Sequence, residues 1–187
     1  MKDLQKKFDE YKKKIHSKEG IGEFYERQIR YLYEKNGWRV EPYGILKGKS
    51  DLGRDLICTK KKQVLIIQAK NWSKRKTIHE KHLMQLAGTI LYYIYKKNNF
   101  PKGVFVTTAK LSDRAKDVAK KLNIQHRNIK LDKNFPMIKC NINKRGKKLF
   151  FFPFDKFYDK VHIDTKNGEF YTTVSYTHLT LPTNTVV

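Results

Sequence analysis

The sequence predicts an α/β fold in which helices flank a mixed central β-sheet. The first observation is a hairpin over residues 53–70 whose strands are apolar on both faces, as in sheets covered above and below. The second is the alternation of helix and strand over residues 79–127, which adds further strands to an antiparallel start. The third is an aromatic-rich stretch with little helical periodicity, which predicts a small β module over residues 135–173.

Two helices are expected before the sheet. Residues 2–18 form a charged leading helix with apolar side chains every three or four positions, namely Leu4, Phe8, Tyr11 and Ile15. A second helix follows Gly20 and stops at Asn36-Gly37, a common C-terminal signal. We therefore expect a leading helix over residues 1–19 and a core domain over residues 20–134.

The sheet elements then follow in order. Residues 38–43 alternate as a strand does, and the Gly- and Lys-rich residues 44–52 are expected to form a loop. The predicted elements after the hairpin are a helix over 79–97, a strand over 103–108, a helix over 112–122 and a short strand over 123–127. Ser112 has the residue type and position of an N-cap.

The hairpin brings three polar side chains together. With a two-residue turn at Lys61-Lys62, Asp55 lies directly opposite Gln68, with Cβ atoms about 5 Å apart. Lys70, two residues further on, projects from the same face. A three-residue turn would instead place Asp55 opposite Ile67, and Asp and Lys at strand ends are also ordinary solubilising choices.

Composition indicates the class of partner. The chain has 187 residues, with 41 Lys and Arg against 18 Asp and Glu, a formal net charge of +23 and a pI of about 9.9. Such an excess favours a polyanion, and nucleic acid is the first candidate because neutralised phosphates release counterions. No long apolar stretch and no basic amphipathic helix with a clean apolar face indicates a membrane partner.

Few features of the sequence indicate the cellular compartment of the protein. The first residues lack the apolar core of a signal peptide. Cys58 and Cys140 lie far apart, with neither metal-ligand spacing nor a disulfide framework. We therefore expect a cytoplasmic protein, and the resemblance described next implies a prokaryotic or phage origin.

Several segments resemble the Mrr-like restriction endonucleases, a branch of the PD-(D/E)xK nuclease superfamily. They are Gly22 to Glu26, Asn36 to Val40, Gly53 to Ile57, Gln68 to Lys70, Gln85-Leu86 and Val104 to Thr108. The resemblance implies a restriction-endonuclease-like core and a DNA endonuclease that hydrolyses phosphodiester bonds. In this branch a glutamine typically replaces the glutamate of the third-strand motif, as Gln68 does here.

The resemblance also implies a metal site. Mg²⁺, with Mn²⁺ as a substitute, would be held by Asp55, Gln68, the main-chain carbonyl of Ala69 and Glu26. Lys70 would orient the attacking water or offset developing charge. Glu23, one turn before Glu26, competes for its role, and Glu26 could equally be an ordinary solvated helix acid.

DNA contacts are expected from residues that flank this site in sequence: Lys47, Lys49, Arg54, Lys74, Arg75, Lys76 and Gln85. Any single basic residue among them could be a solvated surface charge, whereas their summed field would attract DNA. Gln85 could instead cap a backbone group. Cleavage of both strands would usually need two active sites, so a homodimer is expected on symmetry grounds.

The end of the chain is expected to have a different origin. Residues 174–187 resemble a translated sequencing adapter, which would make the β module truncated after Thr173.

Other functions remain open for the same core: a Holliday-junction resolvase, a repair nuclease, or a non-catalytic DNA-binding domain whose metal site Gln68 has weakened.

Overall fold

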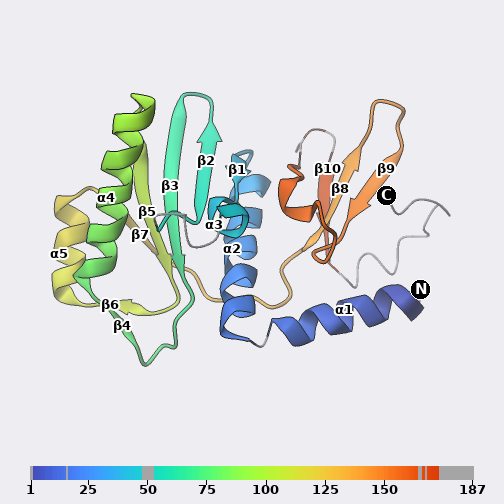
Figure 1. Ribbon diagram of the computed structural model, residues 1–187, viewed down its shortest axis with the longest axis horizontal. Coiled ribbons are helices and arrows are strands. Elements are labelled where there is room, and N and C mark those ends of the chain that lie inside the picture. Colours follow the sequence, from blue (N-terminus) through green and yellow to red (C-terminus); the bar gives the residue numbers. More distant parts are fainter. Residues whose placement is uncertain (1, 16, 48–52, 164–165, 167, 173–187) are drawn as a thin grey trace.

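A mixed five-stranded sheet forms the centre of the protein (Figure 1). The computed structural model describes residues 2–15, 17–47, 53–163, 166 and 168–172. The strand order is β1 (Arg39–Glu41), β2 (Leu56–Lys60), β3 (Gln63–Lys70), β5 (Lys102–Thr107) and β7 (Gln125–Asn128). β1, β2 and β3 are antiparallel neighbours, whereas β3, β5 and β7 run parallel. The predicted fold class is confirmed.

Helices cover both faces of this sheet, as its apolar strands require (Figure 1). On one face α2 (Lys18–Lys35) packs Tyr25 and Ile29 against Ile67 and the residues around it. On the other face lie α4 (Glu80–Lys97) and α5 (Asp113–Lys121), which enclose Ile66 and Phe105. The residues of β3 therefore alternate between two separate cores, and a side chain's position in β3 decides which helix it meets.

The N-terminal helices differ from the prediction at their junction. α1 spans Lys2–Lys14, and α2 begins at Lys18, before Gly20. Ser17 ends the leading segment because its Oγ accepts a hydrogen bond from the Gly20 N–H at 2.9 Å and caps α2. The expectation of one helix through residue 18 was therefore wrong, and a capping serine explains it.

The segment between the first strand and the hairpin also differs. The predicted strand over residues 38–43 shortens to β1, and the predicted loop contains a short helix, α3 (Tyr43–Lys47). Two further strands, β4 (Thr77–Ile78) and β6 (Lys110–Leu111), pair in parallel outside the main sheet. Two-residue strands have no periodicity to detect. The helices predicted over 79–97 and 112–122 are present, and Ser112 caps α5 with its Oγ 3.1 Å from the Ala115 N–H.

A three-stranded antiparallel sheet follows as predicted, in the order β10 (Gly168–Tyr171), β8 (Ile138–Ile142) and β9 (Lys148–Phe151). A 3₁₀ turn, η2 (Tyr158–Lys160), lies between β9 and β10. The predicted adapter-derived tail over residues 174–187 lies outside the described residues. No helix in the described ranges combines the length and apolar character needed to cross a membrane.

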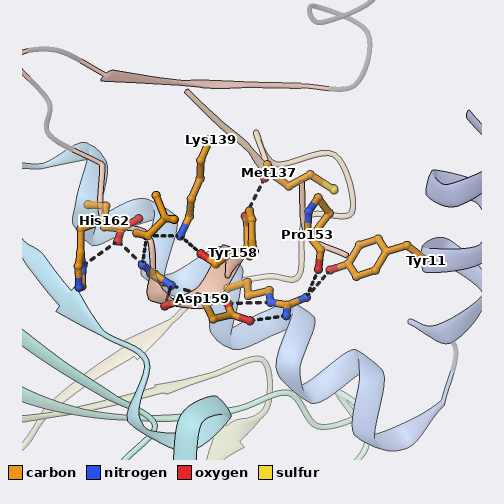
Figure 2. Close-up of polar contacts among 11 residues, drawn as sticks. Tyr11, Met137, Lys139, Pro153, Tyr158, Asp159 and His162 are labelled. Atoms are coloured by element: carbon orange, nitrogen blue, oxygen red, sulfur yellow. Dashed lines mark hydrogen bonds and ion pairs between the residues drawn. The ribbon is translucent and has the colours of Figure 1, made fainter. Parts of the chain in front are cut away.

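This C-terminal module docks on α2 through buried charges (Figure 2). Arg27 donates two hydrogen bonds to the Asp159 carboxylate, at 2.6 and 3.2 Å. Arg30 donates to Glu34 at 2.8 Å and to the main-chain carbonyls of Asp159 and Val161. α2 therefore faces the central sheet on one side and the module on the other.

Lys139 of β8 completes the network. Its ammonium is buried and donates to the carbonyls of Tyr158 and Val161 at 3.1 and 2.8 Å (Figure 2). Apolar packing joins the same surfaces, since Phe24 meets Phe135 with ring centroids 5.1 Å apart. Both polar and apolar contacts thus hold the predicted β module against α2 and the core domain.

Candidate active site

The hairpin has the register that the sequence predicts. Leu56 pairs with Ile67 and Lys60 with Gln63, around a two-residue turn in which Lys61 has φ of +53°. Asp55 lies just before β2, and its N–H donates to the Ile67 carbonyl at 2.9 Å. The regular pairing therefore ends at Leu56 and Ile67, because the Asp55 N–H bonds the same residue that Leu56 faces. The two-residue turn is confirmed and the alternative three-residue turn was wrong, but the expected pairing of Asp55 directly opposite Gln68 is not part of the ladder.

The Asp55 carboxylate is fixed across the hairpin. Its Oδ2 accepts a hydrogen bond from the Ala69 N–H at 2.6 Å, and the side chain is buried. Such a short charge-assisted bond to the backbone sets the orientation of the carboxylate before any ligand arrives. Asp55 is therefore a rigidly held acid between two strands and not a solvated strand end.

Glu26 of α2 meets Asp55 at Gly44. A Cβ built on Gly44 would lie 3.0 Å from Glu26 Oε2 and 3.3 Å from Asp55 Oδ1, so both carboxylates approach one point. The Gly44 N–H also donates to the Asp55 carbonyl at 2.9 Å. Glu23 instead lines a cavity of about 550 Å³ with Tyr11 and the C-terminal module. Of the two competing acids, the structure places Glu26 beside Asp55.

Gln68 lies in the interior next to α4. It is fully buried, and its Nε2 donates to Gln85 Oε1 at 3.4 Å. Considering only the part of the chain that the structure describes, its buried Oε1 has no hydrogen-bond partner. Gly53, with φ of +79°, makes room for this pair, because a Cβ there would lie 2.7 Å from Gln85 Nε2. Gln85 was expected to contact DNA or to cap a backbone group, and the structure places its side chain beside Gln68.

Lys70 ends β3 on the face that also carries Gln68 and Ile66. Burial lowers the pKa of His82 in α4, and the charges of Lys70, Lys81 and His79 lower it further. These effects favour the neutral form of His82 on the side of the sheet toward which Lys70 projects. Its neutrality avoids a second positive charge beside Lys70.

The remaining predicted site residues lie in different parts of the structure. Ala69 lies between Gln68 and Lys70, with its side chain in the core under α2. Lys74, Arg75 and Lys76 are exposed on the loop after β3, and Arg54 is buried beside Asp55. Lys47 is the last residue of α3, and Lys49 lies outside the described residues.

Three residues at the site were missed from sequence. Gly44 admits the two carboxylates, and its neighbour Tyr43 stacks on Arg54. Thr108 fastens the chain after Lys70, since its Oγ1 accepts from the Trp72 N–H at 2.8 Å and donates to the Trp72 carbonyl at 2.6 Å. A Pro-Tyr-Gly sequence directly after a strand was the available signal for a close approach at Gly44.

The donor set is suited to a hard cation. No group of three or more His, Cys, Asp and Glu side chains with metal-binding geometry occurs within the described ranges. Asp55 and Glu26 would therefore supply the carboxylates, and neutral oxygens such as Gln68 Oε1 would complete the set. Carboxylate and amide oxygens are the ligands that Mg²⁺ accepts in proteins, and the buried Oε1 fits that role.

Three solved structures show similarity to the chain. EndoMS in apo form and a repair endonuclease from Pyrococcus abyssi each have 15% identity and a TM-score of 0.35, over 42% and 41% of this chain and 32% of theirs. AF1548, a protein of unknown function, has 18% identity and a TM-score of 0.42, over 55% of each chain. The chain thus spans about a third of the length of the first two proteins. No curated protein shows significant similarity.

The family assignment comes from the sequence. The profile of a family described as restriction endonuclease, the Mrr catalytic domain, matches residues 18–132. The match covers more than half of the chain and includes Glu26, Asp55, Gln68 and Lys70. The predicted resemblance is confirmed, and the chain belongs to the Mrr-type restriction endonuclease family.

Proposed function

We propose that this chain is a metal-dependent DNA endonuclease of the restriction or defence type. The observation that carries the proposal is the Gln68 amide oxygen, which is buried and has no hydrogen-bond partner in the described ranges. Gln68 directly precedes Ala69, whose N–H binds the Asp55 carboxylate. Leaving a polar atom unpaired in a core costs roughly 1–3 kcal/mol, which a bound cation would offset.

The proposed ligands are Asp55, Gln68 Oε1, the Ala69 carbonyl and Glu26. When bound there, Mg²⁺ or Mn²⁺ would polarise the scissile phosphate and acidify a water molecule. The 2.6 Å bond from the Ala69 N–H to Oδ2 holds the Asp55 carboxylate in place. Gln85 accepts a hydrogen bond from the Gln68 Nε2, so that the Gln68 Oε1 is the atom available to a cation. Lys70 donates hydrogen bonds to the attacking water and offsets the charge that develops on the phosphate.

DNA is the proposed substrate and partner. The net charge of +23 supports a polyanion, and the exposed Lys74, Arg75 and Lys76 follow Lys70 on one loop. Lys47 and Lys49, which precede the hairpin in the sequence, are further proposed contacts. Contacts of this kind neutralise phosphates without reading sequence, so they supply affinity that falls steeply with salt.

A plasmid assay tests the proposal. Wild-type protein is expected to nick or linearise supercoiled plasmid with Mg²⁺ or Mn²⁺ and to lose this activity in EDTA. Asp55→Ala and Lys70→Ala should each lower the rate at least about a hundredfold. Lys62→Ala, in the exposed turn at the other end of the hairpin, is the matched control and should retain the rate. Equal nicking by all four proteins would exclude this site.

Gln68 offers a graded test of metal binding. Gln68→Glu adds a negative charge to the proposed donor set and should lower the Mg²⁺ concentration needed for half-maximal cleavage, whereas Gln68→Leu should raise it at least about tenfold. Isothermal titration calorimetry with Mn²⁺, without DNA, should rank the metal affinities of wild type and the two Gln68 variants in the same order. Salt-dependent DNA binding with no cleavage of any substrate would favour a non-catalytic DNA-binding domain.

Substrate panels separate the remaining roles. A restriction-type enzyme should cleave plasmid DNA of one modification state in preference to another. A Holliday-junction resolvase should prefer four-way junctions, and a repair nuclease should prefer mismatched or branched duplexes. Sedimentation on DNA would show whether two chains assemble at one site, as coordinated cleavage of both strands requires.

A further inference from the structure

Three cationic side chains are buried in the described part of the chain: Arg30, Arg54 and Lys139. In two of them every side-chain nitrogen donates a hydrogen bond at the interface with the C-terminal module. Arg30 donates to one carboxylate and two carbonyls, and Lys139 donates to two carbonyls, at 2.6–3.1 Å. The fold therefore satisfies the charges that it buries for structural reasons.

Arg54 is the exception. Only 8% of it is exposed, and within the described ranges its one hydrogen bond runs from Nη2 to the Tyr43 hydroxyl at 3.0 Å. Its Cζ lies 4.1 Å from the centroid of the Tyr43 ring, so the guanidinium rests on that ring. Among the residues the structure describes, its buried Nε has no hydrogen-bond partner, and no carboxylate forms an ion pair with it.

Such a group needs an anion. Burying a guanidinium without a counter-charge is costly, and its five N–H donors are arranged to bind two oxygens of a phosphate at once. The aromatic ring of Tyr43 holds the guanidinium but supplies no full negative charge. The missing partner is therefore a ligand with the charge and geometry of a phosphate.

The position of Arg54 identifies which phosphate. Arg54 directly precedes Asp55, and Tyr43 directly precedes Gly44, the residue against which the Asp55 and Glu26 carboxylates lie. Both members of the pair are thus one residue away from the proposed cation site. A phosphate that reaches the cation is the nearest anion available to Arg54.

We propose that Arg54 binds a non-bridging oxygen of the scissile phosphate and that Tyr43 is the positioning residue that holds its guanidinium for this contact. The inference rests on the proposed function, because it takes DNA as the substrate. It gives Arg54 a different role from the exposed Lys74, Arg75 and Lys76, which would contribute affinity only.

The first experiment measures binding without cleavage. Fluorescence anisotropy of a short DNA duplex in EDTA, over a series of salt concentrations, compares wild type with Arg54→Gln and Arg54→Lys. Arg54→Gln is expected to reduce the slope of log Kd against log salt by about 0.9, the value for one phosphate contact. Lys62→Gln, at the far end of the hairpin, is the control. A slope for Arg54→Gln equal to that of the control would overturn the proposal.

The second experiment separates catalysis from affinity. Under saturating enzyme in single turnover, Arg54→Gln should remain about a hundredfold slower than wild type, because the lost donor acts on the reacting phosphate. Arg75→Gln should weaken binding but recover the full rate at saturation. Full recovery by Arg54→Gln would overturn the role at the scissile phosphate and leave a peripheral contact.

The positioning role has its own pair of variants. Tyr43→Phe keeps the ring and should lower the saturating rate only a few-fold, whereas Tyr43→Leu should lower it almost as far as Arg54→Gln. Equal rates for the two Tyr43 variants would contradict a role for the ring. Melting curves of every variant establish that each is folded. Failure of the wild type to cleave DNA would refute the proposed function, and the salt slope in EDTA would still decide whether Arg54 binds a phosphate.

Discussion

Replacing Lys139 with methionine should change how the stability of this protein depends on pH. The Lys139 ammonium is almost completely buried, and this burial, with the neighbouring charge of Arg30, lowers its pKa from 10.5 to about 7. Glu34 and Asp159 oppose the shift, and Arg27 adds to it. Between these two pKa values the unfolded chain holds a proton on Lys139 that the folded protein has released.

Proton linkage gives the direction in which the free energy of unfolding changes with pH. Because the unfolded state binds more protons in this range, the free energy of unfolding rises with pH, by up to about 1.4 kcal/mol per pH unit. Lys139 thus contributes a gain of about 3 kcal/mol between pH 7 and about pH 9.5, and no pH dependence below the folded pKa. Methionine cannot titrate, so the Lys139→Met variant lacks this gain.

Urea denaturation from about pH 6 to about pH 9.5 measures the effect as the difference between wild type and Lys139→Met, which cancels titrations elsewhere in the chain. The difference should stay constant at the acidic end and then move in favour of wild type above neutrality. Lys147→Met, at the exposed tip of the β8–β9 hairpin, is the control and should follow wild type throughout. Parallel curves for wild type and Lys139→Met would refute a depressed lysine pKa.

Two further changes probe the geometry of the site. Gly44→Ala places a methyl group 3.0 Å from Glu26 Oε2 and 3.2 Å from Asp55 Cα, so plasmid cleavage should fall at least about tenfold while the melting temperature changes by only a few degrees. A rate within twofold of wild type would show that the carboxylates do not need this approach. Thr108→Val removes the hydroxyl that bonds both main-chain groups of Trp72, and should lower the single-turnover rate without weakening DNA binding; a reduced affinity at unchanged rate would contradict it.

The hairpin could be predicted because its information is local. A polar two-residue turn between apolar strands sets one register, and that register fixes the pairing from Lys60 with Gln63 to Leu56 with Ile67. The flanking helices were predictable for a similar reason, since an apolar stripe at helical spacing is visible in a short window. The Mrr-like motifs then supplied the chemistry that spacing alone did not.

The errors occurred where tertiary contacts decide. α3 has too few residues for a periodic signal, and it forms where its Gly44 N–H reaches the Asp55 carbonyl, a contact absent from any local window. The choice between Glu23 and Glu26 depended on the rotation of α2 against the sheet, which the module on its other side helps to set. Arg54 appeared in the sequence as one basic residue among many, because burial without a counter-charge is visible only in three dimensions.

Two neighbouring residues of helix α2 contact two different parts of the protein. Glu26 extends toward Asp55, and Arg27 binds Asp159 in the C-terminal module. The helix cannot turn about its axis to release one residue without displacing the other. Similarity to the family ends at residue 132, yet Arg30 receives acceptors from as far along the chain as Val161. A fragment that keeps every hydrogen bond of α2 must therefore be longer than the segment that sequence similarity defines. A domain excised at residue 132 would lose part of the support for its candidate active site.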